Sequence, residues 1–74
     1  MKIEVKCFAT LAHHAPAGGE LEVEAGTSVD SIIDLLGIPN AEVKIRFVNG
    51  VHVNGDAVVA EGDRVGLFPA VGGG

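Results

Sequence analysis

The sequence has few aromatic residues, a single cysteine and no long apolar run. It lacks tryptophan and tyrosine, and its aromatic side chains are those of Phe8, Phe47 and Phe68. One cysteine cannot form an internal disulfide, which favours a reducing compartment. No stretch is apolar over the length of a membrane-spanning helix, and no signal peptide precedes the first charged residues. We therefore expect a cytoplasmic protein without a membrane partner.

Basic residues are also scarce. Five lysines and arginines stand against ten aspartates and glutamates, which gives a net charge of −5. Nucleic-acid affinity depends largely on cationic side chains that replace counterions, so no nucleic-acid partner is expected. The acidic balance favours solubility and association with a basic protein surface. With 74 residues, 47% of them hydrophobic, the chain has the size and composition of one small packed domain.

Several short segments show the alternation of apolar and polar residues that is typical of half-buried strands. In residues 2–8 the inward positions are Ile3, Val5 and Cys7. Residues 20–24, 42–48 and 64–68 alternate in the same way, and residues 51–53 follow the dipeptide Asn49-Gly50. That dipeptide favours a type I′ hairpin turn, because both residues tolerate the positive φ that the turn needs. The sequence predicts four to five strands.

One helix is predicted in the segment TSVDSIIDLLGIP, residues 27–39. Thr27 is the expected N-cap, and Asp30 can reach back to the first turn. An apolar stripe at helical spacing follows, made of Val29, Ile32, Ile33 and Leu36. Gly37 then permits the left-handed conformation that ends a helix, and Pro39 prevents its continuation.

The order of these elements predicts a β-grasp fold of the α+β class. Two strands, a helix, two strands and a last strand can form one mixed sheet if the last strand lies in the middle, beside the first. The helix then packs on one face of the sheet. We expect residues 1–71 to form this domain and residues 72–74 to form a flexible glycine tail.

Phe8 and Phe68 fall on the face of their strands opposite to the inward residues, and these strands are expected to be neighbours. Two exposed phenylalanines side by side indicate a partner surface, unless a loop covers them. Phe47 is either in the core with Val43 and Ile45 or on the outer face, because the register of a short strand is not set by sequence. On the same strand, Lys44 and Arg46 are interpreted as solvated residues.

No pattern predicts a metal site or an internal active site. His13 and His14 are adjacent and are expected to point apart, and no ligand spacing joins them to Cys7 or His52. Cys7 has no base and orienting group assigned to it, as a nucleophile would need. The eleven glycines match neither a dinucleotide-binding nor a Walker-type loop.

The segment FPAVGGG at the end of the sequence is the most informative motif. Glycines carry no Cβ, so the backbone can enter a narrow cleft and leave the carbonyl carbon of Gly74 open to attack. The chemistry that this favours is activation of the carboxylate by ATP as an acyl adenylate, followed by displacement by a nucleophile. The alternative is a frayed end without function.

These motifs together resemble the MoaD/ThiS sulfur carriers. The resemblance spans essentially the whole chain and rests on KIEVKCFATL, TSVDSIIDLLGIP, VNG, EGDRV and FPAVGGG. It implies that Gly74 is adenylated by an E1-like adenylyltransferase and carries a thiocarboxylate, and that Gly72 and Gly73 thread the partner's channel. Phe8 and Phe68 match positions that dock the large subunit of molybdopterin synthase and the activating enzyme. Pro69 and Val71 are assigned to the same partner surface, which Phe47 joins if its strand has the outer register.

The resemblance further implies a protein that is not catalytic alone and binds no cofactor, since the ATP is used by the activating enzyme. Its expected role is to donate sulfur for the molybdenum cofactor as the small subunit of molybdopterin synthase. The thiazole of thiamin is the alternative destination, with thiazole synthase as the partner. A modifier that is conjugated to lysines through the same adenylate is a second alternative, and a purely structural domain is a third.

Overall fold

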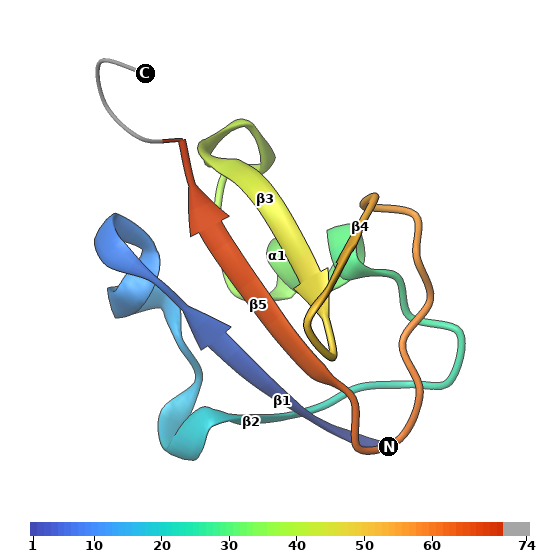
Figure 1. Ribbon diagram of the computed structural model, residues 1–74. Coiled ribbons are helices and arrows are strands. Elements are labelled where there is room, and N and C mark those ends of the chain that lie inside the picture. The colour runs from blue at the N-terminus through green and yellow to red at the C-terminus, as the bar shows by residue number, and fades with distance from the viewer. Residues whose placement is uncertain (71–74) are drawn as a thin grey trace.

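The computed structural model describes residues 1–70 and shows one mixed sheet with a single α-helix on one face (Figure 1). Residues 71–74 lie outside the described part, and with them the expected glycine tail and the domain boundary at residue 71. The elements in chain order are β1 (Lys2–Cys7), η1 (Ala9–His14), η2 (Ala17–Gly19), β2 (Glu20–Glu22), α1 (Val29–Leu35), η3 (Asn40–Glu42), β3 (Val43–Val48), β4 (Val51–Val53) and β5 (Arg64–Pro69).

The five strands lie in the order β2-β1-β5-β3-β4, which confirms the β-grasp fold. β1 and β2 are antiparallel, as are β3 and β4, and each pair lies on one side of β5. β5 runs parallel to β1 and antiparallel to β3, so the last strand fills the middle of the sheet, as expected. β5 therefore joins the two antiparallel pairs into one sheet.

The core lies between α1 and the inward face of the sheet. Ile3 and Val5 of β1, and Val65 and Leu67 of β5, are all at most 2% exposed, as their alternation predicts. The helix contributes its apolar stripe, of which Val29, Ile32 and Ile33 are buried and Leu36 packs at the edge. Removal of this apolar surface from water is the main force that holds helix and sheet together.

The first turn of α1 differs from the expectation. Ser28, and not Thr27, is the N-cap, and its Oγ accepts a hydrogen bond from the Ser31 amide at 3.2 Å. Thr27 is engaged in the preceding turn, where its hydroxyl donates to the Glu24 carbonyl at 2.6 Å. The helix ends as predicted, because Gly37 adopts a φ of 75°.

The Asn49-Gly50 turn has the predicted geometry, with φ values of 52° and 80°. The strand before it, β3, is irregular, because its register with β5 shifts between Val43 and Ile45. After this bulge, Arg46 lies opposite the buried Leu67, and Phe47 lies opposite Gly66. Since directly opposite residues share a face, Arg46 belongs to the helix side of the sheet and Phe47 to the outer side.

The interpretation of Arg46 as a solvated residue is therefore wrong. Its side chain is only 15% exposed, and its Nε lies 3.3 Å from Oδ1 of Asp30 on α1. A second guanidinium nitrogen donates to Oδ1 of Asn40 at 3.1 Å, and Asn40 in turn donates to Asp30 at 2.9 Å. This cluster joins the start of α1 to η3 and β3. Asp30 is thus held by side chains from outside the helix rather than by the helix N-terminus.

Gly55 is required by this cluster. A Cβ at Gly55 would overlap the Asp30 carboxylate, and the Gly55 carbonyl accepts a hydrogen bond from the Asp30 amide at 2.9 Å. We expect Gly55→Ala to lower the free energy of unfolding by about 1–3 kcal/mol, because the Asp30 carboxylate must move and leaves the Nε of Arg46 without its ionic partner. Urea denaturation measures the loss. In an Asp30→Ala background the same substitution should cost much less, and an equal cost in both backgrounds would contradict the explanation.

The EGD sequence before β5 forms a tight junction between three segments. Glu61 accepts a hydrogen bond from the Lys2 amide at 3.1 Å, and Gly62, with a φ of 81°, donates to the Lys2 carbonyl at 2.8 Å. The Asp63 carboxylate accepts from the Asn49 side chain at 2.9 Å and from the Ala60 amide at 2.8 Å. The junction therefore fixes the start of β5 against both β1 and the β3–β4 turn.

Asp63 should make the protein lose stability in acid. Hydrogen bonds from the Asn49 side chain and from the Ala60 amide hold the pKa of Asp63 below its ordinary value of 3.8. Such a group stabilises the fold fully above its unfolded-state pKa and loses that contribution as the pH falls toward its folded-state pKa. We expect urea denaturation to show a steeper loss of stability below pH 3.8 for the wild type than for Asp63→Asn. Asp56→Asn, on an exposed turn outside this junction, should keep the wild-type steepness.

Candidate functional site

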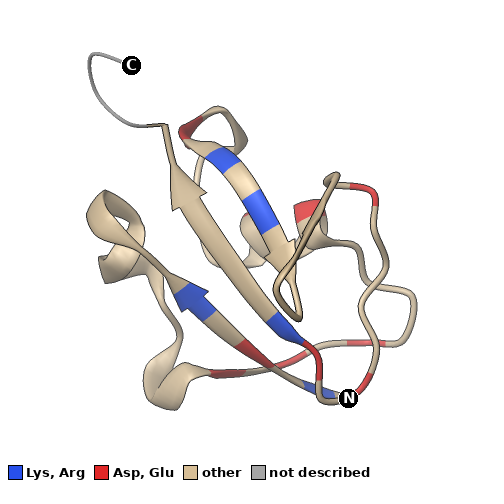
Figure 2. Cartoon of the chain, viewed as in Figure 1, with Lys and Arg blue, Asp and Glu red and all other residues tan. Residues whose placement is uncertain are grey.

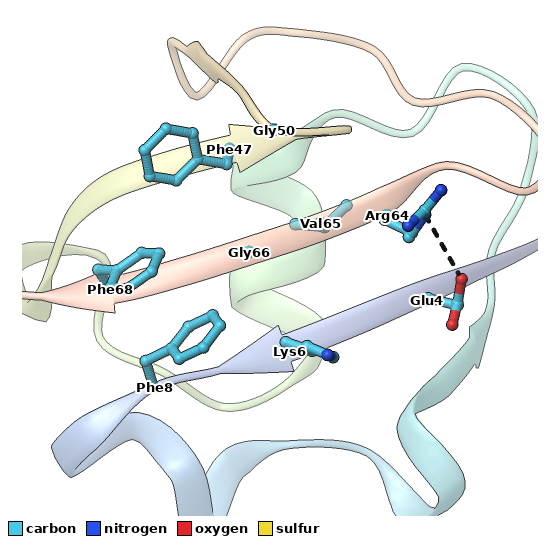
Figure 3. Close-up of a pocket in the computed structure, with 9 residues that line it drawn as sticks. All are labelled: Glu4, Lys6, Phe8, Phe47, Gly50, Arg64, Val65, Gly66 and Phe68. Atoms are coloured by element: carbon cyan, nitrogen blue, oxygen red, sulfur yellow. Dashed lines mark ion pairs between the residues drawn. The ribbon is translucent and has the colours of Figure 1, made fainter.

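The three phenylalanines lie together on the outer face of the sheet (Figure 3). The rings of Phe8 and Phe68 are stacked, with centroids 4.2 Å apart and planes within 3° of parallel. Phe47 meets Phe68 edge-on at 5.6 Å and 80°. Of the two faces left open for Phe47, the structure shows the outer one. Neither Phe8, 37% exposed, nor Phe68 is buried beneath a described loop.

Backbone geometry sets the position of the stacked pair. The Phe8 amide donates to the Leu67 carbonyl at 3.1 Å, which extends the β1–β5 pairing by one residue. Ala9 then adopts a φ of 52°, a conformation that non-glycine residues seldom adopt, and the chain leaves the sheet into η1. Phe68 lies opposite Ile45 of β3, which is itself partly exposed. An apolar surface therefore crosses β1, β5 and β3.

A hollow of about 330 Å³ lies on this face beside the rings. It is lined by Glu4, Lys6, Phe8, Phe47, Gly50, Arg64, Val65, Gly66 and Phe68. Gly66 lies among the three phenylalanines: a Cβ built there would be 3.7 Å from Phe47 and Phe8 and 3.9 Å from Phe68. The absence of a side chain at Gly66 therefore leaves room between the rings.

The other end of the hollow is charged. Arg64 and Glu4 form a loose ion pair at 3.9 Å across β5 and β1, with both side chains more than half exposed (Figure 3). Such a surface pair contributes little to stability, so both groups are available to a partner. Sequence reasoning missed Gly66, Lys6, Glu4 and Arg64 as site residues. The signal was present, because the period of two places them on the same outer face as Phe8 and Phe68.

Cys7, His13 and His14 do not form a catalytic or metal-binding arrangement among the described residues. Burial raises the pKa of the Cys7 thiol, so it is protonated at neutral pH and is a poor nucleophile. The expectation that His13 and His14 point apart is wrong, since their rings lie 4.1 Å from each other in η1. No third ligand joins them, and no cluster of three potential metal ligands occurs among residues 1–70.

The remaining predicted site residues lie along β5 and beyond it. Pro69 is the last residue of β5 and pairs with the buried Val43, so it falls on the helix side of the sheet, opposite to Phe68. Val71, Gly72, Gly73 and Gly74 lie outside the described residues. In the part of the chain that the structure describes, no helix is both long and apolar enough to cross a bilayer.

An exposed apolar face on a small rigid sheet is suited to binding another protein rather than to acid–base chemistry. The hollow is lined by three rings, Val65, two glycines and three exposed charged residues, a composition that suits a docking surface. Fold and face thus define a small ubiquitin-like protein with one apolar face that leads, through β5, toward its C-terminal glycines.

The sequence pattern of the ThiS family matches residues 5–74, and the chain belongs to this family. The match includes the terminal glycines as well as the described domain. No curated protein matches the chain significantly.

Several solved structures share the fold of this chain. SAMP1 from Haloferax volcanii is 25% identical, with both chains covered completely and a TM-score of 0.73. A putative molybdopterin converting factor subunit 1 from Pyrococcus furiosus is 28% identical over 96% of this chain and 99% of that one, with a TM-score of 0.73. Subunit 1 in a complex of the two molybdopterin-converting factor subunits from Helicobacter pylori shares the fold at 18% identity, with a TM-score of 0.60. The protein is therefore a small sulfur carrier of the ThiS/MoaD/SAMP kind.

Proposed function

We propose that the protein carries sulfur as a thiocarboxylate on Gly74 and delivers it to the molybdenum cofactor, in the cytoplasm, as the small subunit of molybdopterin synthase. The observation that carries this proposal is the stacked pair Phe8–Phe68 on the outer face. Phe68 is next to the last residue of β5, so a partner that grips this pair lies beside the point from which the chain continues to its terminal glycines.

The chemistry uses the carboxylate and needs no acid or base from this chain. A carboxylate oxygen attacks the α-phosphate of ATP in the active site of an E1-like adenylyltransferase, which releases pyrophosphate and forms an acyl adenylate. A sulfur nucleophile then displaces AMP from the carbonyl carbon, and the product carries sulfur in place of one carboxylate oxygen. Gly72 and Gly73 have no side chains to obstruct the channel through which Gly74 must pass.

The molybdopterin destination is favoured by two neighbours. The 28% identical Pyrococcus furiosus protein is titled a putative subunit 1 of the molybdopterin converting factor, and the Helicobacter pylori structure is a complex of subunits 1 and 2. The large subunit of molybdopterin synthase is accordingly the proposed second partner. The proposed partner surface consists of Phe8, Phe47 and Phe68, and Pro69 and Val71 belong to the segment that leads from it to the terminal glycines.

Reconstitution tests the destination. The thiocarboxylated protein is mixed in turn with the molybdopterin synthase large subunit and with thiazole synthase from the same organism, each with its own acceptor. We expect sulfur transfer only with the large subunit, followed by intact mass as the carrier returns to its carboxylate form. Transfer only with thiazole synthase would move the protein to thiamin synthesis and leave the carrier chemistry intact.

A second candidate function is protein modification, which the likeness to SAMP1, a small archaeal modifier protein, supports. In this case a lysine amine rather than sulfur displaces AMP, and an isopeptide bond forms. Denaturing gels of cells that express a tagged form would then show conjugates of higher mass, and these would disappear when Gly73 and Gly74 are deleted.

A further inference from the structure

Positive charge is concentrated on the sheet. All five lysines and arginines lie on three strands: Lys2 and Lys6 on β1, Lys44 and Arg46 on β3, and Arg64 on β5. Seven of the ten acidic residues lie outside the strands, in α1, η3 and the connecting segments. Figure 2 shows this separation as blue segments along the strands and red segments mostly around them. Arg46 lies on the helix side, and on the outer face of β2, β1 and β5 the cations Lys2, Lys6 and Arg64 stand among Glu4, Glu20 and Glu22, so this face is less acidic than the net charge of −5 suggests.

Of the two cations that line the hollow, Lys6 and Arg64, Lys6 is the one without an ion pair among the described residues. Lys2 lies 3.9 Å from Glu20, and Arg64 lies 3.9 Å from Glu4, whereas Lys6 makes no ion pair within residues 1–70. Lys6 is exposed and lines the hollow. It is also the register partner of Gly66 on the neighbouring strand. The backbone of Lys6 thus lies directly beside that of Gly66, and its side chain extends along the hollow away from Phe8 (Figure 3).

Gly66 forms the floor of an apolar socket. Its neighbours across the sheet are Lys6 on β1 and Phe47 on β3, while Phe68 follows two residues later on the same face. A Cβ built on Gly66 lies 3.7 Å from the Cβ of Phe47, 3.7 Å from the ring of Phe8 and 3.9 Å from the ring of Phe68, which are ordinary contact distances. One aliphatic side chain from outside can therefore sit on Gly66 and touch Phe8, Phe47 and Phe68 together.

We propose that the hollow recognises a partner-protein segment that places one aliphatic side chain on Gly66 and a carboxylate beside it, against Lys6. This proposal rests on the proposed function, because it assumes that the outer face docks the carrier's protein partner. We infer the chemistry of the bound segment from the residues that line the hollow. The three rings favour an apolar group, and Lys6 favours an anion. A small anion without an apolar part would leave the rings exposed, and an apolar segment without an acid would cover Lys6 unpaired, which is costly.

The socket is tested with Gly66→Leu, whose side chain occupies the space reserved for the partner. The probe is the molybdopterin synthase large subunit, titrated calorimetrically with the full-length carrier. We expect Gly66→Leu to weaken binding about tenfold or more. Gly66→Ala is the matched control, since its methyl group fits at contact distance, and should stay within about threefold of the wild type. Unfolding curves for both variants confirm that the sheet is intact.

The charge is tested with Lys6→Glu, against Lys44→Glu as the matched control. Lys44 is an exposed lysine outside any ion pair of the described residues, and it does not line the hollow. The two variants change the net charge equally. We expect Lys6→Glu to weaken binding about tenfold and Lys44→Glu to have little effect. Equal effects of both variants would mean that overall charge, not recognition by Lys6, is responsible, and would overturn the proposal.

The proposal and the proposed function fail in different ways. If Phe68→Asp abolishes binding while Gly66→Leu and Lys6→Glu bind normally, the outer face docks the partner and the socket is wrong. If Phe68→Asp also binds normally, the docking face itself is wrong, and the proposed function loses the observation that carries it. If only thiazole synthase binds, the same variants are titrated with it, and the same pattern is expected.

Discussion

Removal of Gly74 is expected to abolish the gain of sulfur. The full-length protein, incubated with its E1-like enzyme, ATP and a sulfur donor, should increase in mass by the difference between one sulfur and one oxygen. A chain that ends at Gly73 has a carboxylate one residue too short to reach the activating site through the same channel. Intact mass spectrometry should therefore show it unchanged. Residues 1–70, which make every contact described above, are the same in both proteins.

Two controls make this result interpretable. The activating enzyme must first be shown to be competent on another carrier. Gly74→Ala keeps both the length and the carboxylate and adds one methyl group, so it should react more slowly than the wild type but faster than the deletion. Thiocarboxylate on the shortened chain would show that Gly74 is not the site. No adenylate on the wild type would leave the terminal glycines without this role.

Phe68→Asp should have the largest effect on docking. Phe68 touches both other rings, stacked on Phe8 and edge-on to Phe47, so a carboxylate here places a charge in the centre of the apolar surface. Central aromatic residues of interfaces contribute about 2–4 kcal/mol to binding, which corresponds to a loss of about 30-fold to 1000-fold in affinity. Calorimetric titration with the molybdopterin synthase large subunit and with the E1-like enzyme measures the loss for each partner.

Val51→Asp is the matched control for Phe68→Asp. Val51 on β4 is 63% exposed and does not line the hollow, so the same charge there should leave both affinities unchanged. Loss of the ring stack should reduce stability by only about 0.5–1.5 kcal/mol, and the variant should stay folded. Global unfolding of Phe68→Asp would instead mean that Phe68 contributes mainly to the core, and that the outer face is not a separate docking surface.

The local sequence determined most of the fold. Alternation placed Ile3 and Val5 inward and Phe8 and Phe68 outward, because a strand sends successive side chains to opposite faces whatever it pairs with. The turns at Asn49-Gly50 and at Gly37 could be predicted for a similar reason, since the tolerance of a positive φ is a property of the residue itself. The outer position of Phe8 and Phe68 could be predicted because the face of each residue depends only on the period of its own strand.

The faces of Arg46 and Phe47 were decided only by the tertiary structure, because they depend on how β3 pairs with β5. The bulge between Val43 and Ile45 turns Arg46 toward Asp30 and Phe47 toward Phe68, and a bulge is set by the pairing of two strands and not by either one. The proposed roles of Gly66 and Lys6 likewise depend on the register of β1 and β5, which places a residue without a side chain beside a lysine without an ion pair among the described residues. Short-range pattern fixes the face of a residue where its strand is regular, but only long-range pairing places a bulge and fixes a residue's neighbours.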